Sequence, residues 1–164
     1  MIQHTATVFI LENQQTLLIY HKKMKKWLPP GGHLKSNELP PEGAIREAKE
    51  ETGLDIQLIS QENIWVKPRF NGKSFQRPYM CLLEQIPKYN NEPAHQHIDF
   101  IYLGKPLAGQ LRCNQYETCG LKWFTLREIE TLDRGIEIFD ETYLIIHHLI
   151  KNKSDSSYFT YEEV

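Results

Sequence analysis

The sequence predicts a single α/β domain built on a large sheet. Segments rich in β-branched and aromatic residues recur along most of its 164 residues, separated by polar, proline- or glycine-containing stretches. Two other segments, one in the first third and one toward the C-terminal end, carry apolar residues at helical spacing. A chain of this length fits one domain, and no repeat, linker or low-complexity region divides it.

The first predicted element is a β-hairpin with strands over residues 4–10 and 16–20, joined by the polar turn from Glu12 to Gln15. The stretch from Trp27 to Gly32 contains two prolines and two glycines. These residues predict tight turns rather than regular structure, so that the backbone there can approach a ligand.

A helix is predicted from Pro41 to Thr52. Proline is tolerated in a first helical turn, Glu42 suits the positive end of the helix, and Gly53 stands where a C-terminal cap belongs. Ala44 and Ala48 lie four residues apart and form a narrow apolar face that can pack closely on a sheet. The opposite face is almost entirely charged.

The remaining chain is predicted to supply further strands and two more helices. We expect strands over residues 54–60, 64–67, 79–85, 98–103 and 121–124, and helices over residues 126–132 and 140–151. Residues 153–164 form a polar C-terminal tail, expected to lie outside a domain of residues 1–152.

Composition and charge disfavour several classes of protein. A formal charge of −2 offers no large basic surface for nucleic acid. The chain has neither a signal-peptide pattern at its start nor a run of about 18 apolar residues, so we expect a cytoplasmic protein that does not enter a membrane. The cysteines, Cys81, Cys113 and Cys119, form no CxxC pair and are interpreted as buried, reduced thiols.

The most informative stretch runs from Gly32 to Leu54. Residues three and four apart share a helix face, so Glu47, Glu50 and Glu51 are predicted to converge. Their like charges repel, and a divalent cation would compensate them; magnesium commonly bridges protein carboxylates to substrate phosphates. A glutamate-rich helix considered in isolation, however, is more often a solvated face.

Arg46 is expected to brace this stretch. It lies one turn before Glu50 and one turn after Glu42, and it is placed to reach Glu38 on the preceding loop. Such a contact would hold the loop against the helix, fixing geometry rather than performing chemistry.

The complete spacing decides between the two interpretations of the glutamates. Gly32 is followed by five residues, Glu38, seven residues, and then Arg-Glu-Ala-Lys-Glu-Glu-Thr-Gly-Leu at positions 46–54. This string resembles the complete box of the Nudix (MutT-like) superfamily, without departure. The resemblance implies an α/β/α sandwich around a mixed β-sheet, in which the box binds Mg²⁺ or Mn²⁺.

The resemblance also implies roles for individual residues. By position, Glu47, Glu50 and Glu51 match the metal-binding glutamates, Arg46 and Glu38 the bracing pair, and Gly32 and Gly53 the loop and cap glycines. Some relatives use a further glutamate on a loop before a Trp-Phe strand. Glu117, before Trp123, is the candidate for that metal ligand, with an exposed loop carboxylate as the alternative interpretation.

Water is the expected nucleophile, because bound cations neutralise a diphosphate and lower the pKa of a coordinated water. Glu50 or Glu47 is the expected general base, with Glu117 as a third candidate, and the sequence does not separate them. Activity is expected to rise from neutral to mildly alkaline pH, since the ligands must be deprotonated.

Substrate contacts are expected from the glycines Gly31 and Gly32 and from a basic, aromatic segment. Arg69 and Arg77, with Trp65 nearby, form a mixture that can pair with phosphate and stack on a base. The alternative for this segment is an ordinary basic surface loop.

His95, His97 and Asp99 alternate along the chain and are predicted to share one face of a strand. This pattern superficially resembles a transition-metal site. Because no further ligand lies nearby in the sequence, it is interpreted as structural or substrate-facing.

Together these observations predict a Mg²⁺-dependent hydrolase that cleaves a diphosphate linkage in a nucleoside diphosphate derivative, NDP-X. The substrate would be a nucleoside triphosphate, or ADP-ribose or another nucleotide sugar. A MutT-type (8-oxo-)dGTP diphosphatase is the alternative within this class, and a non-catalytic nucleotide-sensing module is the alternative outside it. The expected partner is a small-molecule nucleotide; family resemblance favours a homodimer, while the sequence leaves the oligomeric state open.

Overall fold

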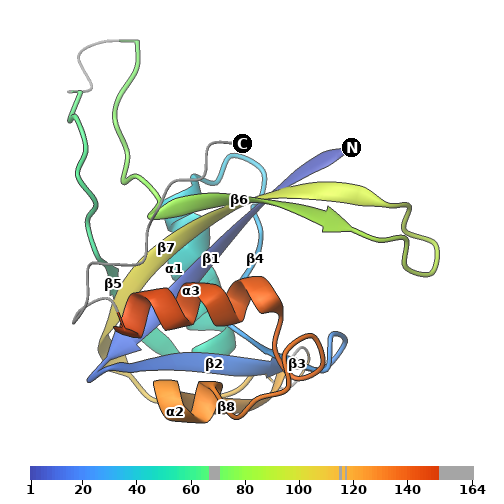
Figure 1. The fold of residues 1–164 in the computed structure, drawn as a ribbon. Helices are drawn as coiled ribbons and strands as arrows, with labels where there is room; N and C mark the ends of the chain where they lie inside the picture. The colour runs from blue at the N-terminus through green and yellow to red at the C-terminus, as the bar shows by residue number, and fades with distance from the viewer. Residues whose placement is uncertain (67–70, 115, 117, 152–164) are drawn as a thin grey trace.

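A central mixed sheet is covered by helices on both faces (Figure 1). The computed structural model describes residues 1–66, 71–114, 116 and 118–151. The elements are β1 (Ile2–Glu12), β2 (Gln15–His21), β3 (Lys26–Leu28), β4 (Gly31–His33), α1 (Pro40–Thr52), β5 (Leu54–Leu58), β6 (Met80–Ile86), β7 (His95–Gly109), β8 (Thr118–Thr125), α2 (Leu126–Ile129) and α3 (Asp140–Lys151).

The sheet is centred on β1 and β7, which pair in parallel. From this pair the order β3-β2-β1-β7-β5 extends in both directions, while β4 also pairs with β1, β6 with β7, and β8 with β2. The contacts of β1 with β2 and β4, and those of β7 with β5 and β6, are antiparallel. The sheet is therefore mixed.

Alternation along β1 divides the apolar core into two layers. Ala6 and Val8 point to the face on which α1 packs, where Ala44 and Ala48 of that helix are fully buried. Phe9 points to the opposite face, in the cluster that includes Ile146 of α3 and Ile129 of α2. The α/β/α sandwich expected from the sequence is thereby confirmed.

The first hairpin forms as expected. Its turn residues Asn13 and Gln14 both have positive φ, 49° and 61°. Two consecutive positive φ angles match the twist of the flanking strands in a two-residue hairpin. Asparagine tolerates this conformation better than most residues, which explains why a turn without glycine can form here.

The caps of α1 follow the sequence signals. Glu42 accepts a hydrogen bond from the backbone N–H of Leu39 at 3.0 Å, at the start of the helix. At its end, Gly53 adopts a left-handed conformation with φ 78° and donates its N–H to Lys49. The helix therefore begins and ends close to the predicted residues.

The expectation of irregular structure from Trp27 to Gly32 is wrong in part, because two short strands lie there. β3 and β4 are interrupted at Pro29 and Pro30, of which Pro30 accepts a hydrogen bond from Val8 through its carbonyl. Gly31 can pair with β1 because it has no Cβ. A Cβ at this position would lie only 2.5 Å from Thr7 Oγ1. Glycine thus permits the strand that its presence appeared to exclude.

The strand expected over residues 64–67 is also wrong for the residues described, 64–66. Residues 60–66 and 71–78, which we call the arm, project from the body of the domain (Figure 1). The Ser74 hydroxyl donates a hydrogen bond to Ile64 O and accepts one from Val66 N–H. These side-chain bonds stand where a strand would have a regular backbone hydrogen-bond ladder. The apolar, β-branched composition of this segment misled the prediction, because its side chains are exposed rather than packed on a sheet.

Smaller differences concern helix length and the cysteines. The helix expected over residues 126–132 ends at Ile129. Cys81 and Cys119 are exposed and Cys113 is partly exposed, so the interpretation as buried thiols is wrong, although all three are free. The alternation of β6 and β8 turns Cys81 and Cys119 outward.

The predicted polar tail, residues 153–164, lies outside the described residues. Among the described helices, none has both the length and the apolar character needed to cross a membrane.

Candidate active site

Arg46 forms the centre of an ionic network on α1. Its Nε and Nη2 atoms donate to the two carboxylate oxygens of Glu38 at 2.7 and 2.9 Å, and its Nη1 donates to Glu47 at 2.6 Å and Glu50 at 3.1 Å. Nη2 also reaches the carbonyl oxygen of His33, at 3.1 Å. The expected contact of Arg46 with Glu38 is formed, and it ties the loop before α1 to the helix.

The network shifts the ionisation of both partners of the brace. The hydrogen bonds from Arg46 lower the pKa of Glu38 to about 2, against a smaller opposing effect of burial. Conversely, hydrogen bonding to Glu38 raises the pKa of Arg46. Both groups are charged throughout the physiological pH range, so the ion pair between Arg46 and Glu38 is kept across that range.

Two of the three box glutamates are buried between α1 and the sheet. Glu51 is 2% exposed and accepts the backbone N–H of Gly31 at 2.9 Å. Glu47 is 8% exposed, and an ideal Cβ on Gly32 would lie 2.6 Å from its Oε1. Gly32 thus admits the Glu47 carboxylate against the strand, which a side chain at residue 32 would obstruct.

Glu50 is the exposed member of the set. Its side chain is 48% exposed and pairs with Lys35 at 3.2 Å as well as with Arg46. An open cavity of about 410 Å³ begins at Glu50; it is lined by Lys49, Glu50, Gly53, Arg112, Cys113, Asn114 and Tyr116. Glu50 therefore lies between the two buried carboxylates and a cavity that a solute can enter.

The residues fit a hard divalent cation. Counting Glu38, Glu47, Glu50 and Glu51 against Arg46 and Lys35 gives a formal charge of −2. The side-chain atoms on this helix face that can bind a metal are carboxylate oxygens, the ligands that magnesium and manganese prefer. Within the described part of the chain, no three His, Cys, Asp or Glu side chains are placed so as to hold an ion by themselves. A cation would therefore need water or substrate oxygens in addition.

Of the remaining candidates, the residues of the basic, aromatic segment that the structure describes do not join this network. Arg77 lies exposed on the arm and makes no side-chain hydrogen bond or ion pair with any described residue. Trp65, on the same arm, is 61% exposed. Arg69 and Glu117 lie outside the described residues.

Sequence reasoning missed the contact of one residue near the box and the partner of another residue that it had singled out. Lys35 occupies an unremarkable loop position, and only the fold reveals that it reaches Glu50. Asp99 is 5% exposed on β7, where it accepts the hydroxyl of Thr5 at 2.9 Å. Burial raises the pKa of Asp99, opposed by hydrogen bonds from Thr7 and Thr5. The alternation of His95, His97 and Asp99 indicated a shared face but not this partner.

A family model described as NUDIX domain matches residues 1–144, which is most of the chain. That range includes β4, α1 and every described member of the Arg46 network. The chain belongs to the NUDIX family. The loop-helix-loop described above is accordingly its Nudix box, and the sequence-based assignment to this family is confirmed.

Known NUDIX relatives resemble the chain at moderate identity. A solved NUDIX-family hydrolase from Clostridium perfringens is 31% identical, with a TM-score of 0.74 over 92% of this chain and 97% of that one. A Bacillus subtilis (strain 168) protein, provisionally described as an 8-oxo-dGTP diphosphatase, is 31% identical over 75% of this chain. A Lactococcus lactis subsp. cremoris (strain MG1363) protein, provisionally described as a DHNTP pyrophosphohydrolase, is 33% identical over 62%. The matches span 66% and 53% of these last two proteins' lengths.

Proposed function

We propose that this NUDIX protein is a hydrolase of phosphoric anhydride bonds that requires Mg²⁺ or Mn²⁺ and acts on a small nucleotide of the NDP-X type. The observation that carries the proposal is the arrangement of Glu47, Glu50 and Glu51 on one face of α1, two of them buried and one open to a cavity. Burying carboxylates costs free energy unless a function or a partner compensates it.

The divalent cation, when bound, would neutralise the diphosphate and lower the pKa of a coordinated water. Glu47, Glu50 and Glu51 are the residues proposed to hold it, with Glu117 as a further candidate from the sequence. Arg46, held by Glu38, is proposed to position the carboxylates of Glu47 and Glu50. Gly31 contributes its backbone N–H to the orientation of Glu51.

Glu50 is the proposed general base. It is the box glutamate with the largest exposure among those described, and it lines the cavity, so water and substrate can reach it. Glu47 is nearly enclosed, at 8% exposed. This difference in access supports Glu50 over Glu47, a choice that spacing alone left open.

The cavity beside Glu50 is the proposed seat of the substrate portion beyond the attacked bond. Lys49 and Arg112 supply positive charge at its edge, and Tyr116, 93% exposed, offers an aromatic face. The Bacillus subtilis and Lactococcus lactis relatives are provisionally described as acting on 8-oxo-dGTP and on DHNTP. These descriptions support a nucleoside triphosphate, rather than a nucleotide sugar, as the first substrate class to test.

The test incubates the purified protein with Mg²⁺ at about pH 8.5 with separate nucleotides, where the ligands are deprotonated. The panel holds dNTPs, 8-oxo-dGTP, ADP-ribose, nucleotide sugars and dinucleoside polyphosphates. The double variant Glu50→Gln/Glu51→Gln should be inactive, and Glu12→Gln, an exposed carboxylate on β1, should be fully active. Cleavage by the double variant would refute the proposed site. Binding without cleavage by the wild type would favour a nucleotide-sensing module instead.

A further inference from the structure

His95 and His97 bring two ring nitrogens together on the face of β7. Their Nε2 atoms lie 3.1 Å apart, and the ring centroids are separated by 4.9 Å. Both residues point from the same face of the strand because they are two positions apart. His33 of β4 packs edge-on against His97, with centroids 4.9 Å apart.

The other nitrogen of each ring faces an oxygen atom. His95 Nδ1 lies 2.9 Å from the carbonyl oxygen of Pro93, which can only accept, so Nδ1 carries the hydrogen. His97 Nδ1 lies 3.5 Å from Glu84 Oε2, on the strand paired with β7. This is an ion-pair contact rather than a hydrogen bond, and it favours the His97 tautomer that carries its hydrogen on Nδ1.

These two tautomers leave a lone pair on each Nε2, and the lone pairs face one another. Such an arrangement is repulsive unless something positive lies between the nitrogens. Two imidazole nitrogens bound to one ion at about 2.1 Å lie roughly 3.0 to 3.4 Å apart for cis-octahedral or tetrahedral angles. The observed separation of 3.1 Å falls in this interval.

We propose that His95 and His97 form a binding site for a borderline transition-metal ion such as Ni²⁺ or Zn²⁺, separate from the Nudix box. Imidazole suits these metals, whereas magnesium prefers the carboxylates of α1. Glu84 and the Pro93 carbonyl orient the two rings from their far sides, as carboxylates and carbonyls do at histidine-metal sites.

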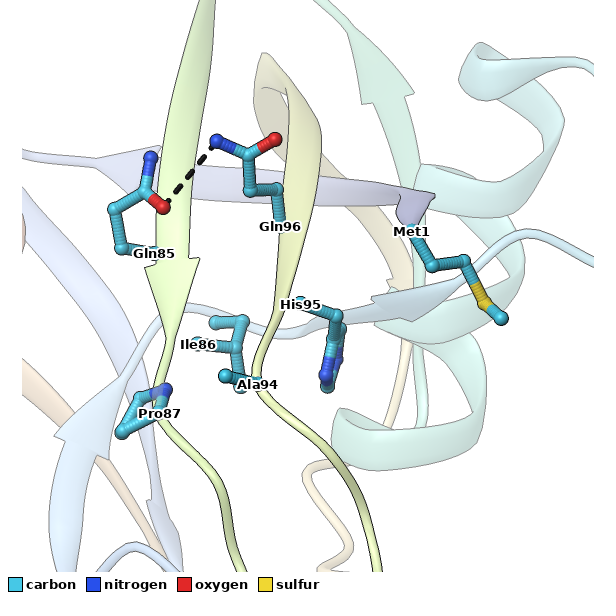
Figure 2. Close-up of a pocket in the computed structure, with 7 residues that line it drawn as sticks. All are labelled: Met1, Gln85, Ile86, Pro87, Ala94, His95 and Gln96. Carbon is cyan, nitrogen blue, oxygen red and sulfur yellow. Dashed lines mark hydrogen bonds between the residues drawn. The ribbon is translucent and has the colours of Figure 1, made fainter.

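The histidine pair can be reached from the side of His95. Among the described residues, no third His, Cys, Asp or Glu joins the pair closely enough to complete a metal site. A cavity of about 400 Å³ begins beside His95; Figure 2 shows this side chain between Ala94 and Met1 at its edge. Water or a small ligand therefore completes the coordination.

The test titrates the full, untagged chain with Ni²⁺ by calorimetry in millimolar Mg²⁺, so that the box is supplied with the ion it prefers. We expect one site, weakened about 100-fold or more by His95→Ala or His97→Ala and about 10-fold by Glu84→Gln. His4→Ala, an exposed histidine of β1, is the matched control and should leave the affinity unchanged. The double variant Glu50→Gln/Glu51→Gln should also retain the site.

A second measurement follows the histidine side chains by long-range ¹H–¹⁵N NMR during Zn²⁺ addition. We expect the Nε2 resonances of His95 and His97 to shift together, with those of His147 unmoved. Absence of Ni²⁺ binding, or binding unaffected by His95→Ala and His97→Ala, would overturn the proposal and assign the short contact to a shared proton. These results do not depend on whether the Nudix box hydrolyses nucleotides.

Discussion

Gly32 and Glu47 lie so close that a single added carbon would meet the carboxylate. An ideal Cβ at residue 32 would be 2.6 Å from Glu47 Oε1 and 2.9 Å from its Cδ. We predict that Gly32→Ala displaces the Glu47 carboxylate and lowers kcat about 100-fold, the order expected when a reacting geometry is misplaced by about 1 Å.

Steady-state kinetics at saturating Mg²⁺ measure this effect. Gly72→Ala is the matched control, because a Cβ there meets no atom within 4 Å, and it should retain wild-type kcat. A fully active Gly32→Ala protein would show that the exact position of Glu47 is unimportant for catalysis.

Arg46 is predicted to be the most sensitive charged residue for stability. Arg46→Ala removes the bonds to Glu38, Glu47 and Glu50, and it leaves the largely buried carboxylates of Glu38 and Glu47 without that cation. We expect the free energy of unfolding to fall by about 3 kcal/mol, the magnitude typical of breaking a buried ion pair from one side. Urea denaturation provides the measurement.

Arg127→Ala, an exposed arginine of α2, should change the unfolding free energy by less than about 0.5 kcal/mol and serves as the control. The double variant Arg46→Ala/Glu38→Gln should lose less unfolding free energy than the sum of the losses in the two single variants, because the residues are in direct contact. Simple additivity would argue against the brace.

Acid sensitivity is predicted at the start of α2. Glu128 accepts the backbone N–H and hydroxyl of Thr125, each at 2.9 Å, and pairs with Lys122 at 3.0 Å. The Thr125 backbone hydrogen bond is the largest cause lowering the pKa of Glu128 to about 2, followed by the side-chain bonds to Lys122 and Thr125. Because the folded pKa lies below the unfolded one, this contribution to stability is present above about pH 4.5 and is lost as pH falls toward 2.

Stability measured by urea titration across this pH window should therefore fall less steeply in Glu128→Gln than in the wild type. Glu130→Gln, two residues along, is the comparison variant. Equal slopes in the wild type and Glu128→Gln would contradict the assignment.

Divalent metal is predicted to stabilise the folded chain through the box. At an Mg²⁺ concentration about 100 times the dissociation constant, linkage gives roughly 2.7 kcal/mol. Thermal unfolding in EDTA and in Mg²⁺ should show a higher Tm with the metal, and Glu50→Gln/Glu51→Gln should abolish the difference. A Tm increase that survives in this variant would place the stabilising ion elsewhere.

Much of the fold could be predicted because local signals and tertiary structure agree. Gly53 caps α1 as expected, and the slim face of Ala44 and Ala48 packs on the sheet. The short strands β3 and β4 could not be predicted, because glycine and proline were interpreted locally while pairing with β1 and β2 decides the outcome. The box is local in sequence, so its helix could be placed in advance.

Contacts between distant parts of the chain were beyond sequence reasoning. The bond from Gly31 N–H to Glu51 joins a strand to a helix 20 residues away. The convergence of His33 and His97 requires β4 and β7 to flank β1, a topology that no spacing pattern encodes. The cavity next to Glu50 likewise could not be predicted from the sequence, because residues from two separate segments line it.

The arm leaves and rejoins the domain at neighbouring points of one strand. Ile59 donates its N–H to Leu103 O at 2.7 Å, and Tyr79 donates to Ile101 O at 2.8 Å, so the two ends attach two residues apart on β7. Since the entropy of closing a loop grows only slowly with its length, a shorter or foreign segment between these anchors leaves the sheet intact. This position is thus one where the connecting segment can be exchanged for another of different length or sequence while the pairing of the sheet strands is kept.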